Sequence, residues 1–219
     1  MFKIVLASFI ALIPHSPSVA LGNETSPRNW DEVCAAVEPN VMEGDLIFLD
    51  IPVFLFRQVA LATQSWTSHV GIVFKDSDGS WFVAEATIPF SKETPLCDYL
   101  RKSSRYKFEI KRLARRLEGA ELEKMRTSAF SMLGKTYGLG FNFDSGRTFC
   151  SKFAYLIYKS IGIEVGKVQT LRELIEENPQ SSTTFWKFWY LWRIPLERRT
   201  VTPASQLNDS KLITVVKGD

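Results

Sequence analysis

Histidine and cysteine are scarce in this chain, which contains two histidines and three cysteines among 219 residues. The cysteines are Cys34, Cys97 and Cys150, and no two of them have the Cys-x-x-Cys spacing of structural zinc sites. The sequence therefore gives little support for a bound metal, and no other pattern indicates a cofactor. Chemistry that depends on an imidazole is restricted to His15 or His69.

An excess of one charge is also missing, because 27 basic residues are balanced by 24 acidic residues, for a net charge of +3. This balance does not indicate a nucleic-acid partner, since such partners bind strongly basic surfaces. One basic segment spans residues 101–116, where Tyr106, Phe108 and Ile110 alternate with polar residues. We interpret it as a strand with a solvated basic face. Binding of that face to anionic glycan or lipid head groups is the alternative.

Long apolar runs are absent, apart from a short one near the N-terminus. A lysine precedes this run at residues 4–13, and small residues follow it. The order is typical of a secretory signal peptide, whereas a membrane span needs about 20 apolar residues. We therefore predict a signal peptide at residues 1–20 and one exported domain at residues 21–219, either periplasmic or extracellular. An uncleaved membrane tether is the alternative.

Export would remove His15 with the signal peptide and would place the cysteines in an oxidising compartment, which favours disulfides. An odd number of cysteines leaves one thiol unpaired. Our hypothesis is a bridge between Cys34 and Cys97, with Cys150 as the free thiol. His69 would then be the one histidine of the exported domain.

The free thiol is predicted to lie in the first turn of a helix. Apolar residues recur at helical spacing after Cys150, and Gly162 is a natural helix end. Unpaired backbone N–H groups and the positive end of the helix dipole favour a thiolate at such a position, as a nucleophilic cysteine requires. The same N–H groups are able to hold an oxyanion. A small buried hydrophobic residue at a helix start is the alternative interpretation of Cys150.

Two predicted strands, "SHVGIVF" and "SWFVAEA", flank the turn "KDSDG". If residues 75–79 form the hairpin loop, Phe74 pairs with Ser80, and His69 lies directly opposite Glu85. Partners across an antiparallel pair share a face and lie about 5 Å apart. Glu85 would then orient and stabilise the imidazole of His69. The alternatives are a solvent-facing Glu85 and a His69 that is a satisfied, partly buried strand residue.

The other segments predict an α+β fold with a small antiparallel sheet, and they contain no repeat or disordered linker. Besides the helix that begins near Cys150, helices are predicted at residues 30–37, 56–64 and 119–135. Residues 44–50 are predicted to form a turn followed by a strand, and further strands are predicted at residues 68–74, 80–86 and 106–113.

Six aromatic residues lie between Phe185 and Trp192. We interpret this density as part of the core, since large apolar side chains are most often buried. The alternative is an acyl-binding surface or a peripheral membrane or lipid contact, because aromatic side chains also favour membrane interfaces.

Four segments in a fixed order, "GDLIFLD", "SHVGIVF", "VAEA" and "FCSKFAYLIYKSIGIEV", resemble the circularly permuted papain-like amidases of the NlpC superfamily, of the YiiX/YaeF type. The resemblance runs from about Gly44 to Val165, with a weaker one in "VTPASQLNDSKL". It implies a permuted papain-like core in which the cysteine-bearing helix packs on the sheet that carries the histidine.

The resemblance also implies roles for three side chains, with Cys150 as nucleophile, His69 as base and Glu85 as the group that orients the base. It implies a hydrolase or transferase that acts on amide or acyl bonds without a metal. One position departs from the family, because members often carry an acidic residue where this chain has Lys152. That departure bears on the chemistry of the pocket near Cys150.

We therefore expect an exported cysteine hydrolase that cleaves an amide bond, in a cell-wall peptide or a related acyl amide, through a Cys-His-Glu triad and a thioacyl intermediate. An acyltransferase or lipid hydrolase that uses the same triad is one alternative. A non-catalytic cell-wall-binding module is the other. The sequence does not define an oligomeric state.

Overall fold

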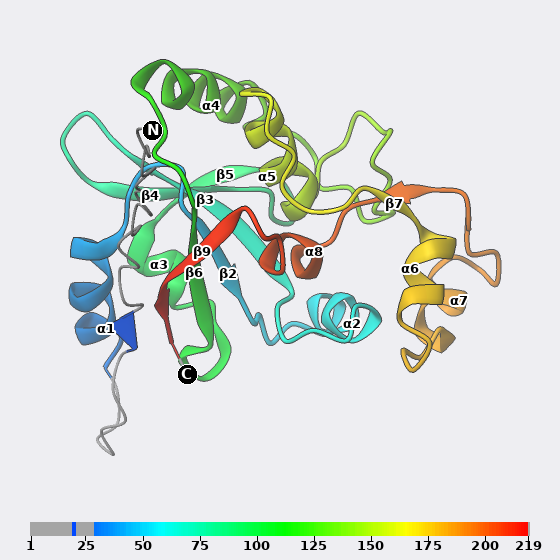
Figure 1. The fold of residues 1–219 in the computed structure, drawn as a ribbon. Coiled ribbons are helices and arrows are strands. Elements are labelled where there is room, and N and C mark those ends of the chain that lie inside the picture. Colours follow the sequence, from blue (N-terminus) through cyan, green and yellow to red (C-terminus); the bar gives the residue numbers. More distant parts are fainter. Residues whose placement is uncertain (1–18, 21–28, 219) are drawn as a thin grey trace, which may run out of the picture.

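Figure 1 shows the computed structural model of the protein, which describes residues 19–20 and 29–218. Its centre is a seven-stranded sheet in the order β1-β9-β6-β2-β3-β4-β5, antiparallel at every pairing except the parallel pair β1 and β9. The strands of this sheet are β1 (Val19–Ala20), β2 (Leu46–Leu49), β3 (His69–Lys75), β4 (Trp81–Glu85), β5 (Lys92–Pro95), β6 (Phe108–Leu113) and β9 (Leu212–Lys217). A second, two-stranded sheet consists of β7 (Gln169–Thr170) and β8 (Arg199–Thr200).

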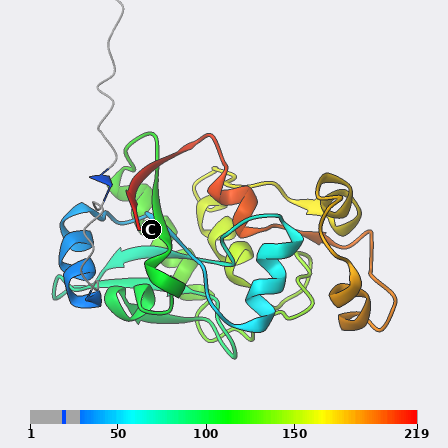
Figure 2. The same ribbon diagram turned by 90° about the horizontal axis from the view of Figure 1, so that it is seen from below.

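Helices lie around the two sheets. They are α1 (Trp30–Val37), α2 (Phe54–Ala62), α3 (Leu96–Leu100), α4 (Gly119–Ser131), α5 (Cys150–Lys159), α6 (Leu171–Glu177), α7 (Thr184–Trp189) and α8 (Pro203–Leu207), with short 3₁₀ helices at η1 (Glu38–Asn40) and η2 (Ser104–Tyr106). In both Figure 1 and Figure 2, α1 lies at one end of the molecule, and α6 and α7 lie at the other.

Strands β2 and β3 are the most buried part of the sheet. Every residue of β2 is buried, and so is every residue of β3 except Lys75. Their continuous apolar runs are what a strand covered on both faces requires. Helix α5 packs against β3, and α3 contacts β4 and β5. A Cβ atom at Gly71 would come within 2.4 Å of the side chain of Val83, so the packing leaves no room for a side chain at this position of β3.

The predicted α+β class with an antiparallel sheet and a cysteine-bearing helix packed on it is confirmed. The sheet is larger than expected, because the sequence does not predict β1, β5 and β9; β1 lies within the segment predicted as a signal peptide. Strand β5 has the sequence "KETP", whose composition does not indicate a strand. It is a strand because its backbone pairs with that of β4.

The predicted register of the β3–β4 hairpin is wrong by two residues. The loop covers residues 76–80, because the N–H of Asp76 donates to the carbonyl of Ser80, and Phe74 pairs with Phe82. His69 is therefore a diagonal neighbour of Glu85. A slip of two residues keeps both side chains on one face, so the predicted proximity survives the error.

The predicted disulfide is confirmed, with Cys34 of α1 bonded to Cys97 of α3 and Cys150 free and buried. The Cα atoms of the bridged pair lie 5.6 Å apart. The bridge fastens α1 to the helix that packs against β4 and β5.

The interpretation of the aromatic stretch as core is wrong for most of the stretch, because α7 contains no buried residue, although Trp186 is half-buried and packs against the core. The predicted signal peptide lies outside the described residues, except for Val19 and Ala20. Within the residues that the structure does describe, no helix combines the length and apolar character needed to cross a bilayer.

The bridge gives a stability prediction. Replacing Cys34 and Cys97 together by serine is expected to lower the free energy of unfolding by about 4 kcal/mol, because the bridge closes a loop with a sequence separation of 63 residues. Urea unfolding of the double variant, beside wild type with and without reductant, measures the change. Reduced wild type serves as the control and should match the variant. Identical unfolding of oxidised and reduced wild type would contradict the prediction.

Candidate active site

Cys150 is the first residue of α5, as predicted, and follows an extended N-cap residue, Phe149, whose side chain does not cap the helix. The first N–H groups of α5 therefore have no cap from this side chain and are oriented toward the space in front of the helix. The dipole of the helix adds positive potential at the same place. The sulfur of Cys150 thus lies where a negative charge is stabilised.

The residues after Cys150 hold the chain in this position. Lys152 is buried, and its ammonium donates to the carbonyls of Ser145 (2.6 Å) and Arg147 (2.8 Å) in the loop that leads into α5. The hydroxyl of Ser151 donates to the carbonyl of Val201 at 2.8 Å. Lys152, the departure from the family pattern, therefore fixes the loop that leads to Cys150 through contacts with its backbone.

His69 and Glu85 meet inside the protein. Nε2 of His69 lies 2.7 Å from Oε2 of Glu85, and both side chains have no exposed surface. The other carboxylate oxygen of Glu85 accepts from the hydroxyl of Thr94 at 2.6 Å and from the ammonium of Lys102. Burial alone would raise the pKa of Glu85, but its contacts with His69 and Lys102 lower that pKa to about 2. Glu85 is therefore an anion held by three donors.

The ring of His69 is enclosed by aromatic side chains. The ring centroids of Phe56 and Tyr99 lie 5.4 Å and 5.8 Å from that of the imidazole. Nδ1 is buried and has no hydrogen-bond partner among the described residues. Because Glu85 occupies Nε2, Nδ1 is the nitrogen left to exchange a proton with Cys150.

Cys150 and His69 perturb one another. Burial opposes a charge on both, yet the interaction with His69 lowers the pKa of the Cys150 thiol below its usual value. For His69, burial is outweighed by the contacts with Cys150 and Glu85, which raise its pKa to about 9. The favoured state is a thiolate beside an imidazolium, which is the state of an activated cysteine nucleophile.

Tyr137 also belongs to this group. Its hydroxyl lies 3.9 Å from the sulfur of Cys150 in hydrogen-bond geometry, and its side chain is buried. This contact helps to lower the pKa of the Cys150 thiol.

The structure brings together all three side chains predicted from the sequence and adds three that were missed. Lys102 was assigned to a solvated basic face, Thr94 lies on an unpredicted strand, and Tyr137 lies in a glycine-rich loop. Of these three residues, only Lys102 could have been predicted from the sequence, because a buried carboxylate such as Glu85 is expected to have a cationic partner.

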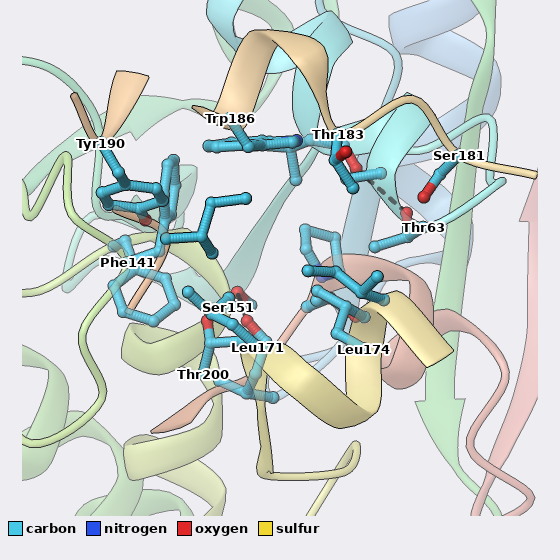
Figure 3. Close-up of a pocket in the computed structure, with 18 of the residues that line it drawn as sticks. Thr63, Phe141, Ser151, Leu171, Leu174, Ser181, Thr183, Trp186, Tyr190 and Thr200 are labelled. Atoms are coloured by element: carbon cyan, nitrogen blue, oxygen red, sulfur yellow. Dashed lines mark hydrogen bonds between the residues drawn. The ribbon is translucent and has the colours of Figure 1, made fainter. Parts of the chain in front are cut away.

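A pocket lies beside Cys150. Helix α2, the start of α5 and the α6–α7 region surround it, and no charged side chain from residues 29–218 lines it. Figure 3 shows Trp186 and Thr183 on one side of the space, facing Leu171 and Leu174 on the other. Such a lining accepts an apolar group close to the nucleophile.

A thiol at the start of a helix that packs on an antiparallel sheet, with an imidazole and a carboxylate on that sheet, is the arrangement of papain-like thiol enzymes. The family model described as the permuted papain-like amidase enzyme, YaeF/YiiX, C92 family, matches residues 40–216, and the chain belongs to this family. The resemblance noted in the sequence is thereby confirmed.

Two Escherichia coli proteins illustrate the similarity. The uncharacterized protein YiiX of strain K12 is 30% identical over 175 residues, which cover 80% of this chain and 85% of the relative. A crystal structure of YiiX from strain O157:H7, described as a metalloprotein, matches with a TM-score of 0.75 and 29% identity, over 81% of this chain and 98% of that chain.

The residues around Cys150 in this chain do not fit a metal ion. Both oxygens of Glu85 are committed to donors, and one of these donors is the ammonium of Lys102, which repels a cation. Across residues 29–218, no cluster of three or more His, Cys, Asp or Glu side chains has the arrangement of a metal site.

The pKa values give a prediction for the reactivity of the thiol. Alkylation of Cys150 by iodoacetamide should begin below the ordinary cysteine pKa of about 8.5, because the imidazolium stabilises the thiolate. The thiolate–imidazolium pair should be lost as the pH rises through about 9, where His69 releases its proton. Alkylation rates and kcat/KM measured from pH 4 to 10 check both limits.

Glu85→Gln sharpens the test. Removing the carboxylate should lower the pKa of His69, which moves the alkaline limit to lower pH, and should raise the pKa of Cys150, which moves the onset to higher pH. Glu93→Gln changes an exposed glutamate of β5 and is the matched control. A profile that Glu85→Gln leaves unchanged would show that the carboxylate does not govern the pair.

Proposed function

We propose that the protein is a cysteine amidase that cleaves an amide bond through Cys150, His69 and Glu85 with a thioacyl intermediate. The observation that supports this most directly is the buried contact of 2.7 Å between His69 and Glu85, next to a thiol with a lowered pKa at a helix start. The family to which the chain belongs consists of permuted papain-like amidases.

In the first half of the proposed reaction, the sulfur of Cys150 attacks the carbonyl carbon of the substrate, and the carbonyl oxygen becomes an oxyanion. The imidazolium of His69 gives its proton to the leaving nitrogen. The C–N bond breaks, the amine departs, and a thioester on Cys150 remains. Glu85 keeps the ring in place throughout and stabilises its charged form.

In the second half, the neutral His69 takes a proton from water, and the resulting hydroxide attacks the thioester carbon. The C–S bond breaks and releases a carboxylic acid. The sulfur returns as a thiolate beside the reprotonated imidazole. Both tetrahedral intermediates place their oxyanion near the N–H groups at the start of α5, and the hydroxyl of Tyr137 is a second donor for it.

The lining of the pocket favours an acyl amide over a cell-wall peptide as the substrate. Cell-wall peptides carry carboxylates and amines that need charged partners, and the pocket beside Cys150 provides none. Binding of an apolar acyl chain in this pocket would instead be favourable, because the chain is transferred out of water. We therefore place the acyl side of the substrate in the pocket.

The same pocket supports acyl transfer as a second function. An apolar lining keeps water scarce around a thioester, so that an amine or alcohol acceptor competes better with hydrolysis. Product analysis with and without an added acceptor distinguishes the two outcomes. From the N-terminal sequence, we also propose that the domain acts after export, in the periplasm or outside the cell.

Removal of the nucleophile tests the reaction. Cys150→Ala is expected to abolish turnover of acyl amides while the protein remains folded, because the thiol contributes a covalent step that alanine cannot replace. Turnover is measured by release of the amine, and folding is checked by thermal unfolding. Turnover by Cys150→Ala equal to that of wild type would exclude the thiol mechanism. Absence of turnover in wild type itself would leave the binding-module alternative.

Acyl-chain length tests the pocket. For a series of acyl amides, kcat/KM should rise about fourfold for each methylene that the pocket buries, since each contributes about 0.8 kcal/mol. Ala62→Trp fills the pocket and should reduce the rate for long chains more than for acetyl amides. Leu61→Trp, at an exposed position of the same helix, is the matched control. Faster cleavage of cell-wall digests than of long-chain amides would overturn the substrate assignment.

A further inference from the structure

Four large apolar side chains next to the pocket are largely exposed. Phe54 is 66% exposed, Phe188 72%, Leu191 82% and Trp192 74%. We call these four residues the aromatic surface. They come from the start of α2 and from α7 with the turn that follows it. Exposure of large apolar side chains to water is unfavourable, so a cluster of them indicates a binding partner.

The two parts of the aromatic surface are joined. The rings of Phe54 and Phe185 pack edge to face with their centroids 5.4 Å apart, and Phe185 stacks on Trp189 at 5.5 Å. These contacts connect α2 to α7, although the two helices are far apart in the sequence. The aromatic surface is therefore carried by two helices that are in direct contact.

The backbone holds two of the side chains outward at a cost. Leu191 and Trp192 have φ angles of 50° and 65°, in the left-handed region that bulky residues avoid. The N–H of Tyr190 donates to Trp186, and that of Trp192 donates to Lys187, which stabilises this turn. Strain that serves to expose apolar side chains is expected where the exposed side chains have a function.

The two chain segments that carry the aromatic surface contain charges of one sign. Residues 51–75 and 178–196 contain no aspartate or glutamate. Arg57, Lys187 and Arg193 lie within these segments and are exposed. None of these three cations has an ion-pair partner among the described side chains. A surface with exposed aromatic rings and free cations matches an anionic lipid interface.

We propose that the aromatic surface docks the protein on an anionic lipid bilayer, with its aromatic side chains in the headgroup region and Arg57, Lys187 and Arg193 against lipid phosphates. Trp186 and Tyr190, from the same segment, line the pocket that leads to Cys150. Docking in this orientation brings the pocket close to the membrane. The proposal does not depend on the proposed catalytic activity, because lipid contact requires no nucleophile.

Sedimentation with vesicles tests the proposal. The exported domain is mixed with phosphatidylcholine vesicles, with or without 30% phosphatidylglycerol, and bound protein is measured. Wild type should bind the anionic vesicles, and binding should weaken as salt concentration rises. Replacing Phe188, Leu191 and Trp192 by serine should reduce the partition coefficient by at least about tenfold.

Matched variants separate the contributions. Serine at Met42, Ile88 and Ile213 removes exposed apolar side chains elsewhere and should leave binding unchanged. Glutamine at Arg57, Lys187 and Arg193 should remove the preference for anionic vesicles. Cys150→Ala should bind as wild type does, so that a failure of catalysis and a failure of docking are distinguished.

Three results would overturn the proposal. One is the absence of wild-type binding to both kinds of vesicle. Another is undiminished binding by the folded serine variant of the aromatic surface. The third is a wild-type dimer in solution that this variant converts to a monomer, which would show that a second copy of the chain covers the surface.

Discussion

The contact between His69 and Glu85 is the constraint around which the site is organised. Two ionisable groups without solvent exposure are tolerated in a sheet only when each satisfies the other. Thr94 and Lys102 complete the satisfaction of the carboxylate, and both come from the β5–α3 region that lies next to β4. The buried carboxylate of Glu85 therefore requires β5 and α3 to lie where they do, as the hydrophobic core also does.

The anion has a further effect on the thiol. A carboxylate with a lowered pKa keeps the imidazole protonated, and the imidazolium keeps the thiol ionised. Each step follows from the proximity of opposite charges in a medium of low polarity. The helix start at Cys150 adds its own potential in the same direction. The reactive state of the cysteine is thus a property of three elements that are distant in the sequence.

Much of this arrangement could be predicted from the sequence, because scarce residues leave few combinations. With one histidine expected after export, the base of the triad follows from count alone. Cys150 depends on its predicted helix start, Glu85 on the hairpin alignment and the family resemblance, and the disulfide on Cys150 being the free thiol. The hairpin register was wrong by two residues, yet the alternation of strand faces preserved the contact of His69 with Glu85. Tyr137 and Thr94 could not be predicted, since their roles depend on the tertiary packing of a loop and an atypical strand. The aromatic stretch after Phe185 was assigned to the core because composition alone does not distinguish burial from exposure.

Helix α2 takes part in three structures that have been described separately. Phe54 at its start contributes to the aromatic surface, Val59 and Ala62 line the pocket, and the ring of Phe56 packs 5.4 Å from the imidazole of His69. Helix α2 therefore connects the outer surface of the molecule with the surroundings of His69. A substitution that shifts this helix is expected to alter the exposed surface, the pocket and the packing against the imidazole together.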